Sequence, residues 1–367
     1  MKIIHCSDLH LDSPMVTSLD ANKRRQRRGE LLETFGRMVD YAESNGVRAV
    51  LVCGDLFDVK APSAAARRFV RDEIASHGDI RFFYIKGNHD SLGLADVGAG
   101  RPDNLVTFSD RWESHRIHDE SGFDVVISGV EAGADGGFDP DLPEWSGDDK
   151  NIVMLHGQLS DYPSAEKAEI IDLGAYRNRH IDYLALGHIH EFRRGELSPG
   201  GVWCYSGCLE GRGFDECGPK GFVLLDVGEG SVETEFIPFA KRGIHNIEVD
   251  ATGAEDMTEI SERAALALAG SGATADDLVK VSIVGEVPVE CEVDLRRLEI
   301  AFSRNYYAFR AKDATRIGVD YDSYEKDASL KGEFVRLIEA DTSLSDDEKA
   351  RVVRMGIAAL SLEGPAL

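Results

Sequence analysis

Five short motifs of aspartate, histidine and asparagine constrain this chain more than any other feature of its sequence. Each follows a short apolar run that predicts a buried strand, namely residues 2–6, 49–53, 81–85, 152–155 and 183–186. The motifs are Asp8-Leu9-His10, Gly54-Asp55, Gly87-Asn88-His89-Asp90, His156-Gly157 and Gly187-His188-Ile189-His190. Apolar residues at helical spacing over 30–42, and a helix expected at 63–76, alternate with the first three runs, which predicts an α/β fold.

The positions of the motifs predict that their side chains converge. Open α/β sheets bind ligands beyond the carboxyl ends of their strands, and glycine lets the backbone turn sharply there. The donors are carboxylate oxygens, an amide oxygen and imidazole nitrogens, without a thiolate. This mixture favours manganese, iron or zinc over magnesium or calcium alone.

The donors are numerous enough for two divalent metal ions. We assign Asp8, His10 and His190 to one ion, and Asn88, His156 and His188 to the other. Asp55 would bridge them, because a carboxylate can offer one oxygen to each ion. Two ions about 3.5–4 Å apart stabilise both the attacking and the leaving oxygen of an in-line displacement, and lower the pKa of the water between them. The predicted reaction is phosphoester hydrolysis.

His89 is adjacent to Asn88 but is not assigned as a ligand. We expect it to donate a proton to the leaving oxygen or to offset the charge of the phosphate. Asp90 would orient His89 and keep it cationic. We interpret the other histidines as surface or packing residues: His5, His77, His115, His118, His180 and His245.

Each motif alone has a simpler explanation. A single Asp-x-His triplet arises by chance, a single Gly-Asp pair often forms a turn or caps a helix, and a single His-x-His is often a solvated loop. Five such motifs at five predicted strand ends favour the two-metal interpretation.

The order of the motifs is that of the calcineurin-like metallophosphoesterases, which the chain resembles over roughly residues 1–240. Within that superfamily it is most similar to the SbcD-type DNA repair exonucleases. The similar segments are MKIIHCSDLHLDSP, GDLFD and YSGCLEGRGFDECGPKGF. Tyr205-Ser206-Gly207-Cys208 departs slightly from the family's turn. Asp58 stands where archaeal and eukaryotic double-strand-break nucleases have histidine and bacterial members often have aspartate, and we do not assign it a catalytic role.

The resemblance implies a four-layer sandwich of two mixed sheets flanked by helices. It implies a DNA exonuclease or endonuclease subunit that uses two divalent ions, with manganese preferred, and an SbcC-like ATPase with a coiled coil as its partner. A homodimer is also compatible. The expected domains are a nuclease domain (1–240), a capping domain (245–320) and C-terminal helices that dock the partner (327–367). Two alternatives stay open: a phosphoesterase acting on a small nucleotide or a phosphoprotein, and a non-catalytic metal-binding scaffold.

The charge balance argues against a general nucleic-acid surface. The chain has 41 basic and 66 acidic side chains and a net charge of −25. A polyanion would therefore need local positive charge, from bound metals or a partner. The one dense basic cluster spans residues 23–28, and we expect Arg24, Arg25, Arg27 and Arg28 to contact backbone phosphates. The alternative is a solvated helix start.

The remaining features predict a cytoplasmic protein. The N-terminus has no apolar segment typical of a signal peptide, and no apolar run is long enough to cross a bilayer. The six cysteines are therefore expected to be reduced. Cys204, Cys208 and Cys217 are close in sequence but lack a C-x-x-C pair, so an ordinary loop is favoured over a structural zinc site.

Overall fold

The computed structural model describes residues 1–15, 19–58, 62–90, 100–119, 122–133, 136–160 and 169–361. The chain divides into two compact units, residues 1–242 and residues 243–367. Among the described residues, no helix is long and apolar enough to cross a membrane.

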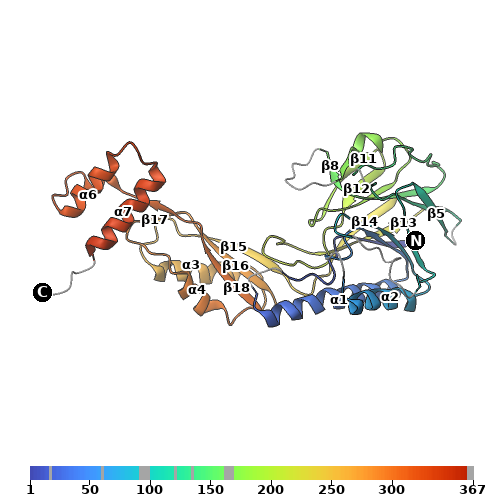
Figure 1. Cartoon of the computed structure of the whole chain (residues 1–367), viewed down its shortest axis with the longest axis horizontal. Helices are drawn as coiled ribbons and strands as arrows, with labels where there is room; N and C mark the ends of the chain where they lie inside the picture. The colour runs from blue at the N-terminus through green and yellow to red at the C-terminus, as the bar shows by residue number, and fades with distance from the viewer. Residues whose placement is uncertain are drawn as a thin grey trace. The chain divides into compact units, whose positions relative to one another are not determined.

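The first unit contains two six-stranded sheets (Figure 1). The first sheet has the order β14 (Val232–Pro238), β13 (Gly221–Val227), β1 (Lys2–Cys6), β2 (Val47–Cys53), β3 (Arg81–Ile85) and β4 (Leu105–Thr107). Strands β1 to β4 run parallel, whereas β13 and β14 are antiparallel to their neighbours. The carboxyl ends of β1, β2 and β3 therefore lie at one edge of this sheet.

The second sheet has the order β11 (Arg193–Ser198), β12 (Gly201–Tyr205), β10 (Tyr183–Gly187), β7 (Lys150–His156), β6 (Asp124–Gly129) and β5 (Glu113–His118). Its four central strands are parallel and its two edge strands antiparallel. Both sheets are thus mixed, which confirms the predicted fold class. Strands β8 (Gln158–Leu159) and β9 (Ile170–Ile171) form a separate short parallel pair.

The two sheets face each other across an apolar core. Buried side chains of the first sheet, such as Leu51 and Phe83, pack against Ile127 and Met154 of the second sheet. The outer face of the first sheet is covered by α1 (Ala21–Ser44) and α2 (Ala64–Ser76). The outer face of the second sheet is covered by the 3-10 turn η2 (Leu173–Ala175) and by loops with large aromatic side chains.

Helix α1 begins nine residues before the predicted helix at 30–42. The carboxylate of Asp20 accepts hydrogen bonds from the backbone N–H groups of Asn22 and Lys23, which caps the helix. The first turns hold the basic run rather than apolar residues, so apolar periodicity does not reveal them.

The second unit has a parallel sheet of three strands, with order β15 (Ile244–Asp250), β16 (Leu278–Val284) and β18 (Ala308–Asp313). Two helices pack on it, α3 (Met257–Gly270) and α4 (Leu295–Phe302). A short parallel pair follows, β17 (Glu286–Pro288) and β19 (Arg316–Gly318). The remaining helices are α5 (Tyr321–Tyr324), α6 (Leu330–Glu339) and α7 (Asp346–Ser361). Val335 of α6 and Val353 of α7 pack against Val289, which anchors both long helices to this unit.

One polar pair lies inside the core between the sheets. His5 of β1 is fully buried, and its Nδ1 lies 2.9 Å from the hydroxyl oxygen of Tyr183 on β10. Burial lowers the pKa of His5 to about 3, because the charged imidazolium would lose its hydration. An unfolded histidine titrates near 6.5, so the unfolded chain binds this proton first as the pH falls. The neutral His5 therefore contributes stability above pH ~6.5 that is lost progressively below it.

We predict that this histidine makes the protein acid-sensitive. Lowering the pH from 7.5 to 5 should reduce the free energy of unfolding of the wild type by about 2 kcal/mol, because His5 is protonated only in the unfolded chain. His5→Phe should remove this pH-dependent loss and add a pH-independent loss of stability, because the Tyr183 hydroxyl no longer contacts an imidazole nitrogen. Urea unfolding of both metal-free proteins at the two pH values measures the difference. Equal losses in the two proteins would show that His5 does not titrate on unfolding.

Candidate metal centre

The five motifs converge at the carboxyl ends of five strands. Asp8 and His10 follow β1, Asp55 follows β2 and Asn88 follows β3. His156 ends β7, while His188 and His190 follow β10. The two sheets present these ends to one another, and the structure brings all seven predicted ligands into one cluster.

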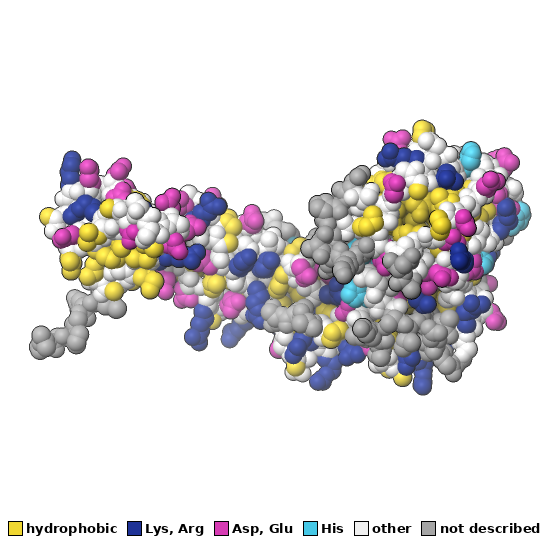
Figure 2. Space-filling model, turned by 45° about the horizontal axis from the view of Figure 1, so that its top comes forward, with side chains coloured by type: hydrophobic (Ala, Val, Ile, Leu, Met, Phe, Trp, Pro, Cys, Tyr) yellow, Lys and Arg dark blue, Asp and Glu magenta, His cyan; other side chains and the backbone are white. Residues whose placement is uncertain are grey.

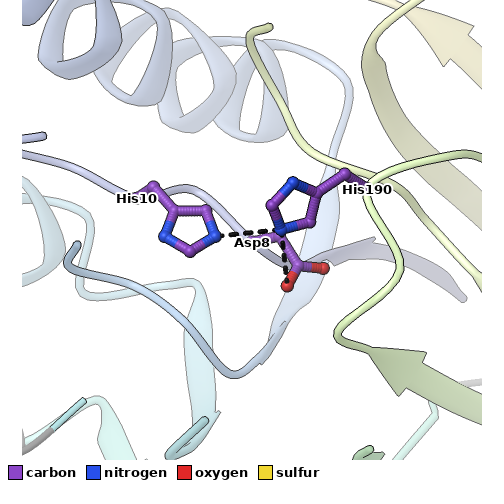
Figure 3. A group of neighbouring side chains, drawn as sticks. All are labelled: Asp8, His10 and His190. Carbon is purple, nitrogen blue, oxygen red and sulfur yellow. Dashed lines mark hydrogen bonds and ion pairs between the residues drawn. The ribbon is translucent and has the colours of Figure 1, made fainter. Parts of the chain in front are cut away.

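Asp8, His10 and His190 form the first group (Figure 3). The Nε2 atoms of His10 and His190 are 3.1 Å apart, and Nε2 of His190 lies 3.8 Å from Oδ1 of Asp8. Burial disfavours the charged form of Asp8, but the nearby His190, His156 and His10 hold its pKa below the usual value. Two imidazole lone pairs and a carboxylate that point at one another fit a divalent cation between them.

Asn88, His156 and His188 form the second group. The Oδ1 atom of Asn88 lies 3.0 Å from Nε2 of His156 and 3.4 Å from Nδ1 of His188. His156 is buried, and its Nδ1 lies 2.9 Å from the carbonyl oxygen of Cys53. That carbonyl can only accept a hydrogen bond, so Nδ1 carries the proton and the lone pair of Nε2 faces the cluster.

Asp55 lies between the two groups. Its Oδ2 atom is 3.8 Å from Nε2 of His10 and 3.5 Å from Nε2 of His156. Its Oδ1 atom accepts a hydrogen bond from the backbone N–H of His89. The Asp55 carboxylate is almost completely buried and faces one histidine of each group, which is the geometry expected of a bridging ligand.

The backbone is strained at four of these positions. Asp8, His10, Asp55 and His188 have φ angles of 52°, 44°, 50° and 103°. Positive φ is uncommon outside glycine, and such residues cluster at functional sites, where the surrounding structure holds them. The strain indicates that the loops are shaped to aim these side chains.

His89 lies beside the cluster as predicted. Its ring packs edge-on against the ring of His10, with centroids 5.2 Å apart, and its side chain is 45% exposed. The imidazole is therefore accessible from solvent at the edge of the metal groups.

The role predicted for Asp90 is wrong. Both carboxylate oxygens of Asp90 accept hydrogen bonds from backbone N–H groups, those of Leu56, Phe57 and Gly87. Burial raises the pKa of Asp90, and the hydrogen bond from Phe57 opposes that rise. Asp90 joins the loop after β3 to the loop after β2. The carboxylate that faces His89 is that of Asp58, with its Oδ1 atom 4.0 Å from Nδ1.

The basic run is only partly available for a substrate. Arg27 is fully buried and donates to Glu30, Glu210 and the carbonyl oxygen of Gly211, so its prediction as a phosphate contact is wrong. Arg28 is half exposed but is paired with Asp12. Arg24 and Arg25 are exposed on the first turns of α1.

Three residues behind the first group contact or hold its histidine ligands, a role that the sequence did not suggest. Asp58 and Glu216 face the Nδ1 atoms of His10 and His190, at 3.0 and 2.7 Å. Arg212 donates to both carboxylates. Nearby cations and hydrogen bonds outweigh burial and hold the pKa values of Asp58 and Glu216 well below their usual values. The signals in the sequence were the resemblance of the segment that contains Arg212 and Glu216, and the aspartate at position 58.

The cysteines do not form a zinc site of their own. In the part of the chain that the structure describes, Cys204, Cys208 and Cys217 do not come together as a metal-ligating group. Cys208 instead lies near Glu216, with Sγ 4.0 Å from Oε2.

The fold and the donor cluster together define a metal-dependent phosphoesterase. Residues 1–192 match the family model described as calcineurin-like phosphoesterase, and the chain belongs to that family.

Two curated relatives are similar over much of the chain. The chain is 28% identical over 280 residues to the uncharacterized metallophosphoesterase YhaO of Bacillus subtilis, which covers 71% of this chain and 65% of that protein. It is 26% identical over 323 residues to the DNA double-strand break repair protein Mre11 of Thermoplasma acidophilum, which covers 82% of each. The match thus spans just under two thirds of the Bacillus relative's length. Among solved structures, a dimetal phosphatase from Danio rerio aligns with a TM-score of 0.43 and 13% identity, over 65% of this chain and 99% of that chain.

We predict that Gly87 is required for metal binding. A Cβ atom at this position would lie 2.2 Å from Oδ1 and 2.6 Å from the backbone nitrogen of Asp55. Gly87→Ala should therefore displace the Asp55 carboxylate and weaken manganese binding by about 10-fold or more. Titration calorimetry of metal-free protein measures this. Gly78→Ala is the matched control, because a Cβ there meets no atom within 4 Å. Equal affinities in the two variants would contradict a bridging role for Asp55.

Proposed function

We propose that this protein is a nuclease of the SbcD type, which hydrolyses DNA phosphodiester bonds with two divalent metal ions, preferably manganese. The observation that carries the proposal is the placement of the Asp55 carboxylate between two groups of three donors. The similarity to a DNA double-strand break repair protein over 82% of each chain supports DNA as the substrate.

Each group would hold one ion. Asp8, His10 and His190 would bind the first, Asn88, His156 and His188 the second, and Asp55 would contribute to both. When bound, two such ions neutralise phosphate charge and lower the pKa of a coordinated water, which generates the nucleophile. The chain's part is to fix the donors: the buried carboxylates and the strained loops hold them in place before a substrate arrives.

His89 would act on the leaving group. Its backbone N–H donates to Asp55, which fixes the residue beside the bridging ligand, while its imidazole is half exposed. A protonated imidazole in this position can transfer a proton from its ring nitrogen to the leaving oxygen. Asp58, rather than Asp90, is the carboxylate that can stabilise its cationic form.

Substrate phosphates would be guided by local charge. The chain has a net charge of −25, so its surface as a whole repels DNA. Arg24 and Arg25 are exposed and remain the candidates for backbone contacts. The acidic surface also favours a second candidate, a phosphoesterase that acts on a small nucleotide or a phosphoprotein.

We predict that His89 supports chemistry and not metal binding. In manganese, the wild type should cleave labelled duplex or hairpin DNA as well as bis-p-nitrophenyl phosphate. His89→Ala should lower DNA cleavage by about 100-fold or more and leave the metal content unchanged. Turnover of bis-p-nitrophenyl phosphate should fall much less, because p-nitrophenolate leaves without a proton. Turnover assays with elemental analysis measure both quantities.

The same assay separates the two candidate functions. Cleavage of a phosphopeptide or a nucleotide without any cleavage of DNA would contradict the nuclease proposal and favour the second candidate. Loss of a metal from His89→Ala would contradict the role given to His89.

The C-terminal helices would dock the partner, an ATPase with a coiled coil. Their inner faces pack on their own unit, but four apolar side chains stay exposed: Leu330, Leu337, Met355 and Leu360. Hydrophobic side chains gather on the surface of this part of the chain (Figure 2). Leu330 and Leu337 are seven residues apart on α6, the spacing of anchors in helix-in-groove recognition. Apolar side chains that water contacts are stabilised when a helical partner covers them.

We predict that charge at the exposed apolar positions of α6 and α7 abolishes docking. The double substitution Leu337→Glu and Met355→Glu should prevent co-purification with the ATPase, because it buries two charges at the contact. Metal content and diester hydrolysis should not change. Leu266→Glu is the control, since Leu266 is equally exposed on α3, outside these helices. A retained complex in the double variant would contradict docking at α6 and α7.

A further inference from the structure

Arg212 connects two carboxylates that stand directly behind the first metal group. Its Nη1 atom donates to Oδ1 of Asp58 at 2.9 Å, and its Nη2 atom donates to Oε1 of Glu216 at 2.9 Å. Its backbone N–H donates to Oε2 of Glu216 at 2.6 Å. The arginine is held at both its backbone and its guanidinium, so its position is fixed.

Each of the two carboxylates faces one histidine of the same metal group. Oε1 of Glu216 lies 2.7 Å from Nδ1 of His190, and Oδ1 of Asp58 lies 3.0 Å from Nδ1 of His10. Ionised carboxylates only accept hydrogen bonds. Glu216 therefore favours the His190 tautomer with the proton on Nδ1, which turns its Nε2 lone pair toward the metal position. Asp58 contacts Nδ1 of His10 at ion-pair distance without hydrogen-bond geometry, so it holds that imidazole by charge and packing. One guanidinium thus links the two imidazoles through their carboxylates.

The arginine is needed because the carboxylates are poorly hydrated. The side chains of Glu216 and Asp58 are 5% and 15% exposed. Without a cation between them, these two poorly hydrated charges would repel one another and move apart. A planar guanidinium offers parallel donors to two carboxylates, whereas a lysine ammonium is a single point charge on a flexible stem.

The second metal group has a different support. Nδ1 of His156 faces the carbonyl oxygen of Cys53, which belongs to a strand of the sheet core. That partner is neutral and does not depend on Arg212. A substitution of Arg212 should therefore change the metal affinity of the first position and leave that of the second unchanged.

We propose that Arg212 is a positioning residue that sets the affinity of the Asp8–His10–His190 position for its metal ion. The inference rests on the two-metal function proposed above and extends it to the residues that hold the ligands.

Positioning and simple electrostatics make opposite predictions. Arg212 is a cation close to the metal positions, so its removal would tighten the binding of both ions if charge alone mattered. If Arg212 positions the ligands, its removal should weaken one ion and leave the other unchanged. Outer partners of metal ligands typically contribute 10- to 100-fold in affinity.

The test is a manganese titration of metal-free protein by calorimetry, with the wild type, Arg212→Met and Arg212→Lys. We expect two ions in the wild type, and a loss of about 10- to 100-fold for one of them in both variants. Arg212→Lys should not restore the affinity, because one ammonium group cannot donate to both carboxylates as the planar guanidinium does. Arg116→Met is the matched control: Arg116 also joins two carboxylates, those of Asp124 and Asp149, but behind no metal ligand. It should bind manganese as the wild type does.

Three outcomes separate the possibilities. Unchanged or tighter binding of both ions in Arg212→Met, or wild-type binding in Arg212→Lys, would overturn the positioning role. A wild type that binds no manganese would overturn the proposed function instead. Circular dichroism and thermal melting of the metal-free proteins check the fold. If Arg212→Met does not fold, Glu216→Gln decides, because it keeps the volume of Glu216 and removes one of the two charges that Arg212 holds; the same selective loss is expected.

Discussion

The architecture of the first unit depends on burying a bridging carboxylate where two sheets meet. Asp55 is almost fully excluded from water, and histidines from both sheets approach its Oδ2 atom. A buried carboxylate is costly unless cations or hydrogen-bond donors surround it. The donors come from strands of both sheets, so the cluster assembles only when the sheets pack with their carboxyl ends together. The apolar core between the sheets provides the free energy that holds this arrangement.

This close approach explains why glycine precedes several of the ligands. A Cβ atom on Gly54 would lie 2.2 Å from Nδ1 of His156, which comes from the other sheet. A Cβ atom on Gly87 would meet the carboxylate of Asp55. The glycines of the Gly-Asp and Gly-Asn motifs therefore make room for a ligand of a neighbouring loop. The motifs of this sequence are consequences of packing as much as of chemistry.

The sequence predicted what lies at strand ends and missed what depends on distant packing. Asp8, His10 and Asn88 lie at the predicted edge of the sheet, because each comes a few residues after an apolar run whose carboxyl end lies at that edge. Asp90 was misjudged because its partners are backbone N–H groups of another loop, which no local pattern reveals. Arg27 was misjudged because basic runs are normally solvated, whereas Glu210, 183 residues later, buries it.

The residues that hold the metal ligands were the least predictable part of the site, because they are also brought together by distant packing. Arg212 and Asp58 are 154 residues apart, and Glu216 carries no motif of its own. What the sequence did contain was Asp58, at a position where the family resemblance implies histidine in archaeal and eukaryotic nucleases and often aspartate in bacterial members. A carboxylate there adds a negative charge to a cluster that already holds Asp8, Asp55 and Glu216, and such a cluster needs a fixed cation to keep its carboxylates in place. Arg212 supplies that cation at 2.9 Å, so the aspartate at position 58 and the arginine at position 212 form one electrostatic unit.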